Sequence, residues 1–177
     1  MHRLFVAIQP PRPIREQLLA LMGGVSGARW QSDDQLHITL RFIGEVESRV
    51  ADDVASALSA VRQAAFEIAL SAVGTFDRRG QTEVIWAGLQ PHEPLIALHQ
   101  KIDQACVRAG LEPEHRAYHP HITLARLKRG ATGPIGGFLE SAGISSAPFR
   151  VDGFGLYEST LTSEGAVYTM VERYPLD

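Results

Sequence analysis

Two copies of one four-residue motif stand out in this sequence of 177 residues. The motif His-Ile-Thr-Leu begins at His37 and again at His121, 84 positions later. A histidine side chain has an ordinary pKa of about 6.5, so it can accept or donate a proton near neutral pH. Hydrolysis of a phosphodiester needs one group to deprotonate water and another to protonate the leaving oxygen. Two histidines that face one cleft can divide these roles.

The threonine of each motif follows its histidine by two residues. Successive side chains of a β-strand point to opposite faces, so Thr39 lies on the same face as His37. By the same rule Thr123 shares a face with His121, while the isoleucine and leucine side chains point into the core. We expect both hydroxyls to donate hydrogen bonds to the non-bridging oxygens of a phosphate. Such a site requires no metal.

The composition limits the class of protein. Hydrophobic residues make up 45% of the sequence and charged residues 21%, which is typical of a soluble globular domain. A chain of this length buries roughly 70% of its unfolded surface, so a single domain needs no disulfide to hold it together. The net charge of −3 argues against broad binding to long nucleic acid, although a small local phosphate site remains compatible with it.

The sequence also favours a reducing compartment. Its single cysteine, Cys106, excludes an intramolecular disulfide and falls on the apolar face of a predicted helix. The apolar run at residues 4–8 is too short for a signal peptide, and no apolar stretch is long enough to cross a bilayer. We therefore expect a cytoplasmic monomer that does not associate with membranes.

The predicted elements follow the same order in two halves of the chain. Alternating and helical periodicities predict strands near residues 4–9, 36–44, 66–72, 83–89, 121–126, 149–157 and 166–173, and helices near 13–22, 46–61, 94–109 and 135–142. Each half reads strand, helix, histidine strand, helix, strand, which is typical of an internal duplication. We predict one domain over residues 1–177, with a duplication at approximately 1–75 and 81–177 and two lobes around a shared cleft.

The sequence resembles the 2H phosphoesterase superfamily, which is named for paired His-x-Thr-x motifs. More closely, it is similar to the bacterial RNA 2′,3′-cyclic phosphodiesterases (the ThpR or LigT family), which are also known for RNA 2′,5′-ligase activity. The likeness is carried by the opening Arg-Leu-Phe-Val-Ala-Ile at residues 3–8, by the flanks of both histidine motifs at 36–45 and 119–126, and by the C-terminal Leu-Tyr-Glu-Ser at 156–159.

The resemblance implies an α+β, bilobal fold with two pseudo-symmetric antiparallel sheets, helices on their outer faces and a central cleft. It also implies hydrolysis of RNA or nucleoside 2′,3′-cyclic phosphates to 2′-phosphate ends, with His37 and His121 as the catalytic pair. In this relation Thr39, Thr123 and Arg126 bind the phosphate. We expect His121 to activate water and His37 to protonate the departing 3′ oxygen, although the near-symmetry allows the reverse.

One difference between the two motifs can be seen directly in the sequence. Arg126 stands five residues after the second histidine, whereas Phe42 stands five residues after the first. Arginine offers a planar fork that suits phosphate oxygens, so we expect the phosphate to lie nearer the second motif. Phe42 either packs in the core or stacks on the base or ribose. Strict alternation would place Arg126 on the face opposite His121, so this site needs a β-bulge or a strand end there.

Three alternatives remain open at this level. The histidines at 115, 119 and 121 with Glu114 suggest a metal site, but Pro120 argues against the helix that such spacing requires. RNA 2′,5′-ligation is the reverse reaction, with a 5′-hydroxyl in place of water. A non-catalytic module that binds RNA ends would keep the cleft, but it would not need two titrating imidazoles. No sequence fingerprint for an organic cofactor is present, and we expect neither a cofactor nor a metal.

Overall fold

The computed structural model describes residues 1–128 and 135–177 of the chain. Its strands are β1 (His2–Ile8), β2 (Ala28–Trp30), β3 (Ile38–Val46), β4 (Phe66–Arg78), β5 (Gln81–Gln90), β6 (His121–Leu127), β7 (Phe149–Val151), β8 (Gly153–Thr162) and β9 (Gly165–Pro175). Its helices are α1 (Arg12–Leu21), α2 (Ser48–Leu58), α3 (Glu93–Arg108), α4 (Ile135–Ser141) and the short 3₁₀ helix η1 (Asp33–Gln35).

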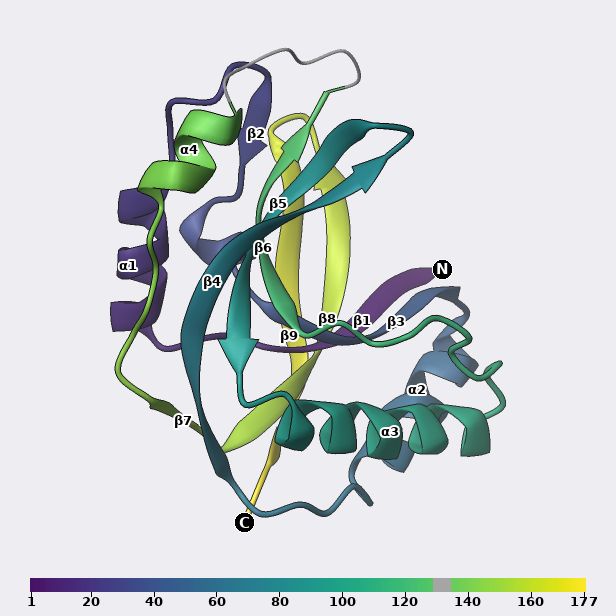
Figure 1. Cartoon of the computed structure of the whole chain (residues 1–177). Helices are drawn as coiled ribbons and strands as arrows, with labels where there is room; N and C mark the ends of the chain where they lie inside the picture. The colour runs from purple at the N-terminus through teal and green to yellow at the C-terminus, as the bar shows by residue number, and fades with distance from the viewer. Residues whose placement is uncertain (129–134) are drawn as a thin grey trace.

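All strand pairings are antiparallel, and the strand order is β7-β4-β5-β6-β3-β1-β8-β9, with β2 added beside β6. The strands curl strongly, as Figure 1 shows. Four strands on either side of the middle form two half-sheets, which join where Ile38 of β3 pairs with Ile122 of β6. The α+β fold with two related antiparallel halves is therefore confirmed. The two sheets expected from the sequence are joined by the pairing of β3 with β6 into one continuous sheet.

The half-sheet with His37 takes strands from both ends of the chain, whereas the four strands of the other half, β4 to β7, follow one another along the chain. Strand β4 pairs with β5 in the half that carries the second motif, and the C-terminal hairpin β8–β9 pairs with β1 in the other half. The predicted single strand at 149–157 is wrong for this reason: β7 pairs with β4 while β8 pairs with β1, so the chain crosses between halves at Asp152. The proposed boundaries of the duplication remain a prediction.

The helices begin and end where the sequence signals predict, within a few residues. Helix α1 has a proline in its first turn, and α3 has Pro94 there, which suits a position whose N–H needs no helical partner. Helix α3 ends before Gly110, whose φ of 102° lies in the left-handed region. Helices α2 and α3 lie against each other at one end of the molecule, and α1 and α4 lie on another side (Figure 1). No helix in the described ranges could span a membrane.

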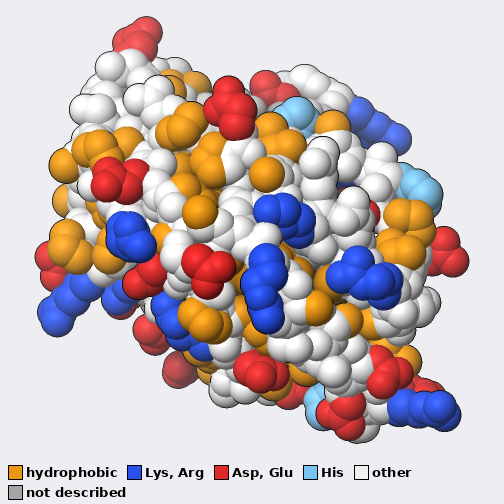
Figure 2. All heavy atoms as spheres, turned by 90° about the horizontal axis from the view of Figure 1, so that it is seen from below, with side chains coloured by type: hydrophobic (Ala, Val, Ile, Leu, Met, Phe, Trp, Pro, Cys, Tyr) orange, Lys and Arg blue, Asp and Glu red, His pale blue; other side chains and the backbone are white. Residues whose placement is uncertain are grey.

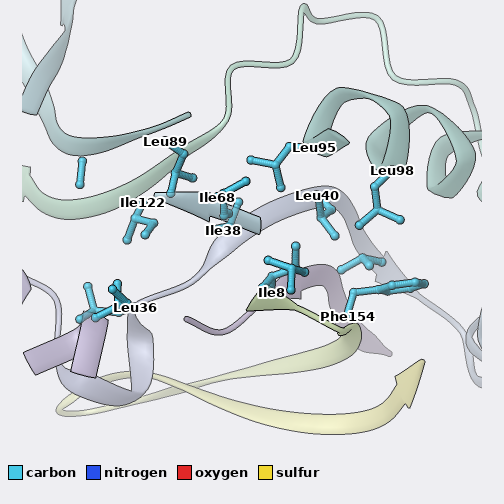
Figure 3. Packing of buried hydrophobic residues seen from close by; sticks show 14 of the residues in the cluster. Ile8, Leu36, Ile38, Leu40, Ile68, Leu89, Leu95, Leu98, Ile122 and Phe154 are labelled. Atoms are coloured by element: carbon cyan, nitrogen blue, oxygen red, sulfur yellow. The ribbon is translucent and has the colours of Figure 1, made fainter. Parts of the chain in front are cut away.

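One continuous apolar core connects both half-sheets to the helices. Figure 3 shows side chains of β3, β6 and α3 within one buried cluster, with Ile38, Ile122 and Leu98 among them. Cys106 belongs to this core and is fully buried, as its helical spacing predicts, and burial raises the pKa of its thiol to about 11. Since the core spans both halves, it fixes one half-sheet against the other.

Candidate active site

Both histidine motifs lie at the junction of the two half-sheets. His37 immediately precedes β3, His121 is the first residue of β6, and the residues that follow them, Ile38 and Ile122, are paired directly. The isoleucine and leucine side chains of both motifs are fully or almost fully buried, whereas the histidines and threonines are partly exposed. The predicted alternation of faces is confirmed in both motifs, which present their polar side chains from adjacent strands.

The two imidazoles are held in the same way. Nδ1 of His37 lies 2.6 Å from the carbonyl oxygen of Gln35, and Nδ1 of His121 lies 2.6 Å from that of His119. A carbonyl oxygen only accepts hydrogen bonds, so Nδ1 carries the proton in both rings and donates it. In the neutral form Nε2 then has the lone pair. Each ring can therefore accept a proton at Nε2, or donate one from Nε2 when it is charged.

Burial disfavours the charged form of both imidazoles. The pKa of His37 is lowered to about 4. Burial has the largest effect, the hydrogen bond to Gln35 opposes it, and the nearby charges of His121 and Arg126 add to the lowering. The pKa of His121 is also lowered, first by burial and then by Arg126 and His119. Arg126 acts on the pKa of both rings, which places all three groups in one electrostatic environment. Burial and the charge of Arg126 therefore both favour the uncharged form of each ring.

Aromatic rings flank each histidine, and most of these neighbours escaped the sequence analysis. Phe5 and Tyr168 contact the His37 ring, with centroid distances of 5.0 and 5.3 Å. Phe76 lies 4.9 Å from the His121 ring in an edge-on arrangement, and Trp86 lies 6.4 Å from it. These contacts come from other strands, so only the pairing of β1, β9, β4 and β5 brings them to the site.

A β-bulge places Arg126 on the face of the histidines. Strand β6 carries one extra residue relative to β5 at Leu124, so Leu124 and Ala125 are both fully buried. The alternation restarts after this bulge, and Arg126 shares the outward face with Thr123. The bulge that the sequence requires for this arginine is present.

Strand β3 carries the equivalent bulge. Leu40 is the extra residue relative to β1, and both Leu40 and Arg41 are buried. Phe42 consequently lies on the face of Thr39, where it is 54% exposed and contacts the Phe5 ring at 6.1 Å. Its exposure places Phe42 outside the core. The two bulges therefore bring an arginine and a phenylalanine to corresponding positions beside the two histidines.

Different groups satisfy the carbonyl oxygens at the two bulges. Nδ1 of the buried His99 donates to the Leu40 oxygen at 2.6 Å, and the Tyr118 hydroxyl donates to the Thr39 oxygen at 2.8 Å. The His99 and Tyr118 rings are stacked with centroids 4.3 Å apart. In the second motif the backbone N–H of Gln31 donates to the Leu124 oxygen at 2.8 Å. These contacts hold both bulges in place, and periodicity gave no signal for them.

The residues of the alternative metal site have other partners or lie apart. Glu114 contacts the buried Arg41 at 3.4 Å, and Asp103 contacts the same guanidinium at 2.9 Å. Within residues 1–128 and 135–177, no group of three or more His, Cys, Asp or Glu side chains is arranged to hold a metal ion. The carboxylate of Glu114 thus pairs with Arg41 of β3 and does not form a cluster with His119 and His121.

A groove of about 900 Å³ opens beside the first histidine. His37 and Arg126 line it together with Phe5, Tyr157 and Tyr168, and the β8–β9 hairpin forms one of its walls. The Gln35 amide donates to the carbonyl oxygen of Ala166 at 2.9 Å and ties this hairpin to η1. His121, Thr39, Thr123 and Phe42 lie outside the lining of this groove. It offers aromatic and apolar surface next to the phosphate-binding residues that the sequence predicts.

Comparison with known proteins identifies the family. The profile of the 2′-5′ RNA ligase superfamily matches residues 10–162. The chain belongs to this superfamily. Among its relatives, the RNA 2′,3′-cyclic phosphodiesterase of Escherichia coli is 33% identical over 179 residues, which cover 98% of this chain and 96% of the relative. The enzyme of the same name from Aeropyrum pernix is 32% identical over 139 residues, which cover 77% and 79%.

Solved structures of this superfamily have the same fold. The crystal structure of E. coli LigT complexed with 3′-AMP superposes with a TM-score of 0.80 and 31% identity, covering 99% of this chain and 98% of the other. A crystal structure from Thermus thermophilus gives a TM-score of 0.79 at 26% identity and covers 98% and 97%. The resemblance recognised in the sequence motifs is therefore confirmed by sequence and by fold over nearly the whole chain.

Proposed function

We propose that the protein is a metal-independent RNA 2′,3′-cyclic phosphodiesterase in which His37 and His121 exchange protons with the reacting oxygens. One observation carries this proposal: two imidazoles with Nδ1 fixed on a backbone carbonyl share one electrostatic site at the junction of the half-sheets. The relatives that cover nearly all of this chain have the same named activity. The substrate is an RNA 3′ end, or a nucleoside, that bears a 2′,3′-cyclic phosphate.

In the proposed reaction, Nε2 of one histidine removes a proton from water as the water oxygen attacks phosphorus. The bond between phosphorus and the 3′ oxygen breaks, and the other histidine donates its Nε2 proton to this oxygen. The products are a 2′-phosphate and a 3′-hydroxyl. Negative charge grows on the non-bridging oxygens, where Arg126 and the hydroxyls of Thr39 and Thr123 donate hydrogen bonds. Within the described residues, neither threonine hydroxyl has another hydrogen-bond partner.

The pKa values favour an order of roles opposite to the one expected from the sequence. His37 has its pKa lowered to about 4, so it remains unprotonated over the widest pH range and suits the base. His121 lies closer to Arg126 along the chain and suits the acid once an anionic phosphate has raised its pKa. We therefore assign water activation to His37 and protonation of the 3′ oxygen to His121.

Phe42 and the aromatic wall of the groove provide apolar contacts for the nucleoside. Phe42 is exposed, and Phe5, Tyr157 and Tyr168 form aromatic surface next to His37. Aromatic faces stack on any base, so this surface supports binding without strong base preference. The same arrangement also accommodates the reverse reaction, 2′,5′-ligation, in which a 5′-hydroxyl attacks in place of water.

Product analysis tests the proposal. The protein is incubated with 2′,3′-cyclic AMP in the presence of EDTA, and the products are separated by chromatography. We expect 2′-AMP and no loss of rate with the chelator. Formation of 3′-AMP would contradict the assignment of the 3′ oxygen as leaving group. Binding of the nucleotide without turnover would identify a non-catalytic module that recognises RNA ends.

A further inference from the structure

A second groove also borders Arg126. It has a volume of about 670 Å³ and runs between the tip of the β4–β5 hairpin and the end of β6. Arg126 lines this groove and also the groove beside His37. The two grooves therefore meet at the arginine that the proposed function places on the reacting phosphate. The polar and charged lining side chains include Arg78, Arg79, Thr82, Glu83, Arg126 and Lys128.

The second groove concentrates positive charge in a protein that is acidic overall. Among the described residues that line it, four side chains are exposed cations and Glu83 is the one carboxylate. Across residues 1–128 and 135–177, no ion pair engages these cations. Asp77, next to the groove, accepts a hydrogen bond from Thr82 at 2.9 Å. By contrast, Figure 2 shows Lys and Arg mixed with Asp and Glu on the face seen from below.

The tip of the hairpin carries an arginine in a position that suits a smaller residue. Arg79 has a φ of 53° and Gly80 a φ of 75°, and the flanking residues Arg78 and Gln81 are paired. These values describe a two-residue turn of the type that favours Asn-Gly, because side chains with a Cβ are hindered at positive φ. The turn geometry alone gives no reason for an arginine at position 79. What Arg79 adds is a second guanidinium beside that of Arg78 in the lining of the groove.

We propose that this basic groove binds the phosphodiester backbone of the RNA strand on the 5′ side of its terminal nucleotide. The inference rests on the proposed function, since a cyclic phosphate at the 3′ end leaves the rest of the strand to extend in one direction only. With the terminal phosphate on Arg126, the strand enters the groove toward Arg79 and Lys128. Contacts to phosphates position a strand without reading its bases. The protein then prefers short RNA ends to mononucleotides, and base identity has little effect.

The test compares two substrates that have the same 3′ nucleoside: a short oligoribonucleotide ending in a 2′,3′-cyclic phosphate, and the cyclic mononucleotide. The double variant Arg78→Gln/Arg79→Asn removes two charges, and Asn is compatible with the left-handed turn position. A matched control, Arg49→Gln/Arg108→Gln, removes two exposed charges from α2 and α3. We expect the hairpin variant to lower the ratio of kcat/KM for oligonucleotide over mononucleotide about tenfold at low salt, and the control to leave this ratio unchanged.

The dependence on salt gives an independent readout. For binding to single-stranded nucleic acid, the slope of log affinity against log salt concentration becomes shallower by about 0.7 for each phosphate contact that is removed. The hairpin variant should therefore have a slope for the oligonucleotide that is shallower by about 1.4 than that of the wild type. An unchanged ratio with an unchanged slope, or the same change in the control, would overturn the inference.

Failure of the proposed function is distinguishable from failure of the groove. If the wild type turns over neither substrate, the cyclic phosphodiesterase assignment fails. The groove is then tested by fluorescence anisotropy with a 3′-phosphorylated oligoribonucleotide. A shallower salt slope for Arg78→Gln/Arg79→Asn alone would support the groove, and equal slopes for all three proteins would exclude it.

Discussion

The two halves of the site share a plan and differ in chemistry. Each has a histidine whose Nδ1 is bonded to the carbonyl two residues earlier, and each has a bulge three residues after that histidine. After the bulge, the half with His37 presents Phe42, whereas the half with His121 presents Arg126. A common backbone thus positions the two imidazoles in the same way, and in the proposed reaction the side chain after each bulge decides which half holds the phosphate and which contacts the nucleoside.

The strongest test of this comparison removes each histidine in turn. Because Nδ1 of both imidazoles is held in the same way and each ring transfers one proton in the proposed reaction, His37→Ala and His121→Ala should both lower kcat for 2′,3′-cyclic AMP by about 10² to 10⁴ fold. Steady-state kinetics on folded variants, verified by circular dichroism, measures this effect. A variant that retains wild-type turnover would show that its half has no part in the chemistry.

The second test compares substitutions at the two corresponding positions that differ between the halves, Arg126 and Phe42. Arg126→Gln removes a charged hydrogen bond to the phosphate and should lower kcat/KM about ten- to a hundredfold. Phe42→Ala should act mainly on KM, raising it about fivefold for loss of roughly 1 kcal/mol of stacking. Equal effects of the two variants on kcat would contradict the division between a phosphate half and a nucleoside half.

The pH profile separates the roles of the two imidazoles. The base must be unprotonated, so activity should fall at low pH as His37 titrates near its pKa of about 4. The acid must be protonated, and the lowered pKa of His121 places the alkaline limb of kcat/KM below about 6.5. The bell-shaped profile should thus have its maximum on the acidic side of neutrality. Residual activity of His37→Ala should lack the acidic limb, and that of His121→Ala the alkaline limb; the opposite pattern would restore the order expected from the sequence.

The smallest expected effect concerns the support of the first bulge. Tyr118→Phe removes the hydroxyl that donates to the Thr39 carbonyl and should lower the free energy of unfolding by about 1 kcal/mol. For a domain of this size the melting temperature should fall by about 2 to 4 °C. Thermal denaturation measures this change. Tyr157→Phe is the matched control, because no hydrogen bond from its hydroxyl occurs among the described residues. An equal fall of the melting temperature in both variants would show that the hydrogen bond to Thr39 does not contribute to stability.

The sequence predicted what depends on neighbours along the chain. Alternation identified the outward faces of His37 and His121, and it also required the bulge before Arg126. It did not reveal Phe5 and Phe76 beside the histidines, because these contacts depend on which strands pair across the sheet. The division of residues 149–157 into β7 and β8 was missed for the same reason. Side-chain chemistry at one site can be found from local patterns, whereas its surroundings depend on long-range topology.

The pairing of both chain ends within one half-sheet has a consequence for folding. Strand β1 pairs with β8, which is close to the other end of the chain, so the half-sheet with His37 forms only after most of the polypeptide has been brought together. The four strands of the other half-sheet, β4 to β7, follow one another along the chain, but both halves draw on one shared core. Unfolding should therefore be a single cooperative transition, and refolding should be slow relative to helical proteins of this length because of its high contact order.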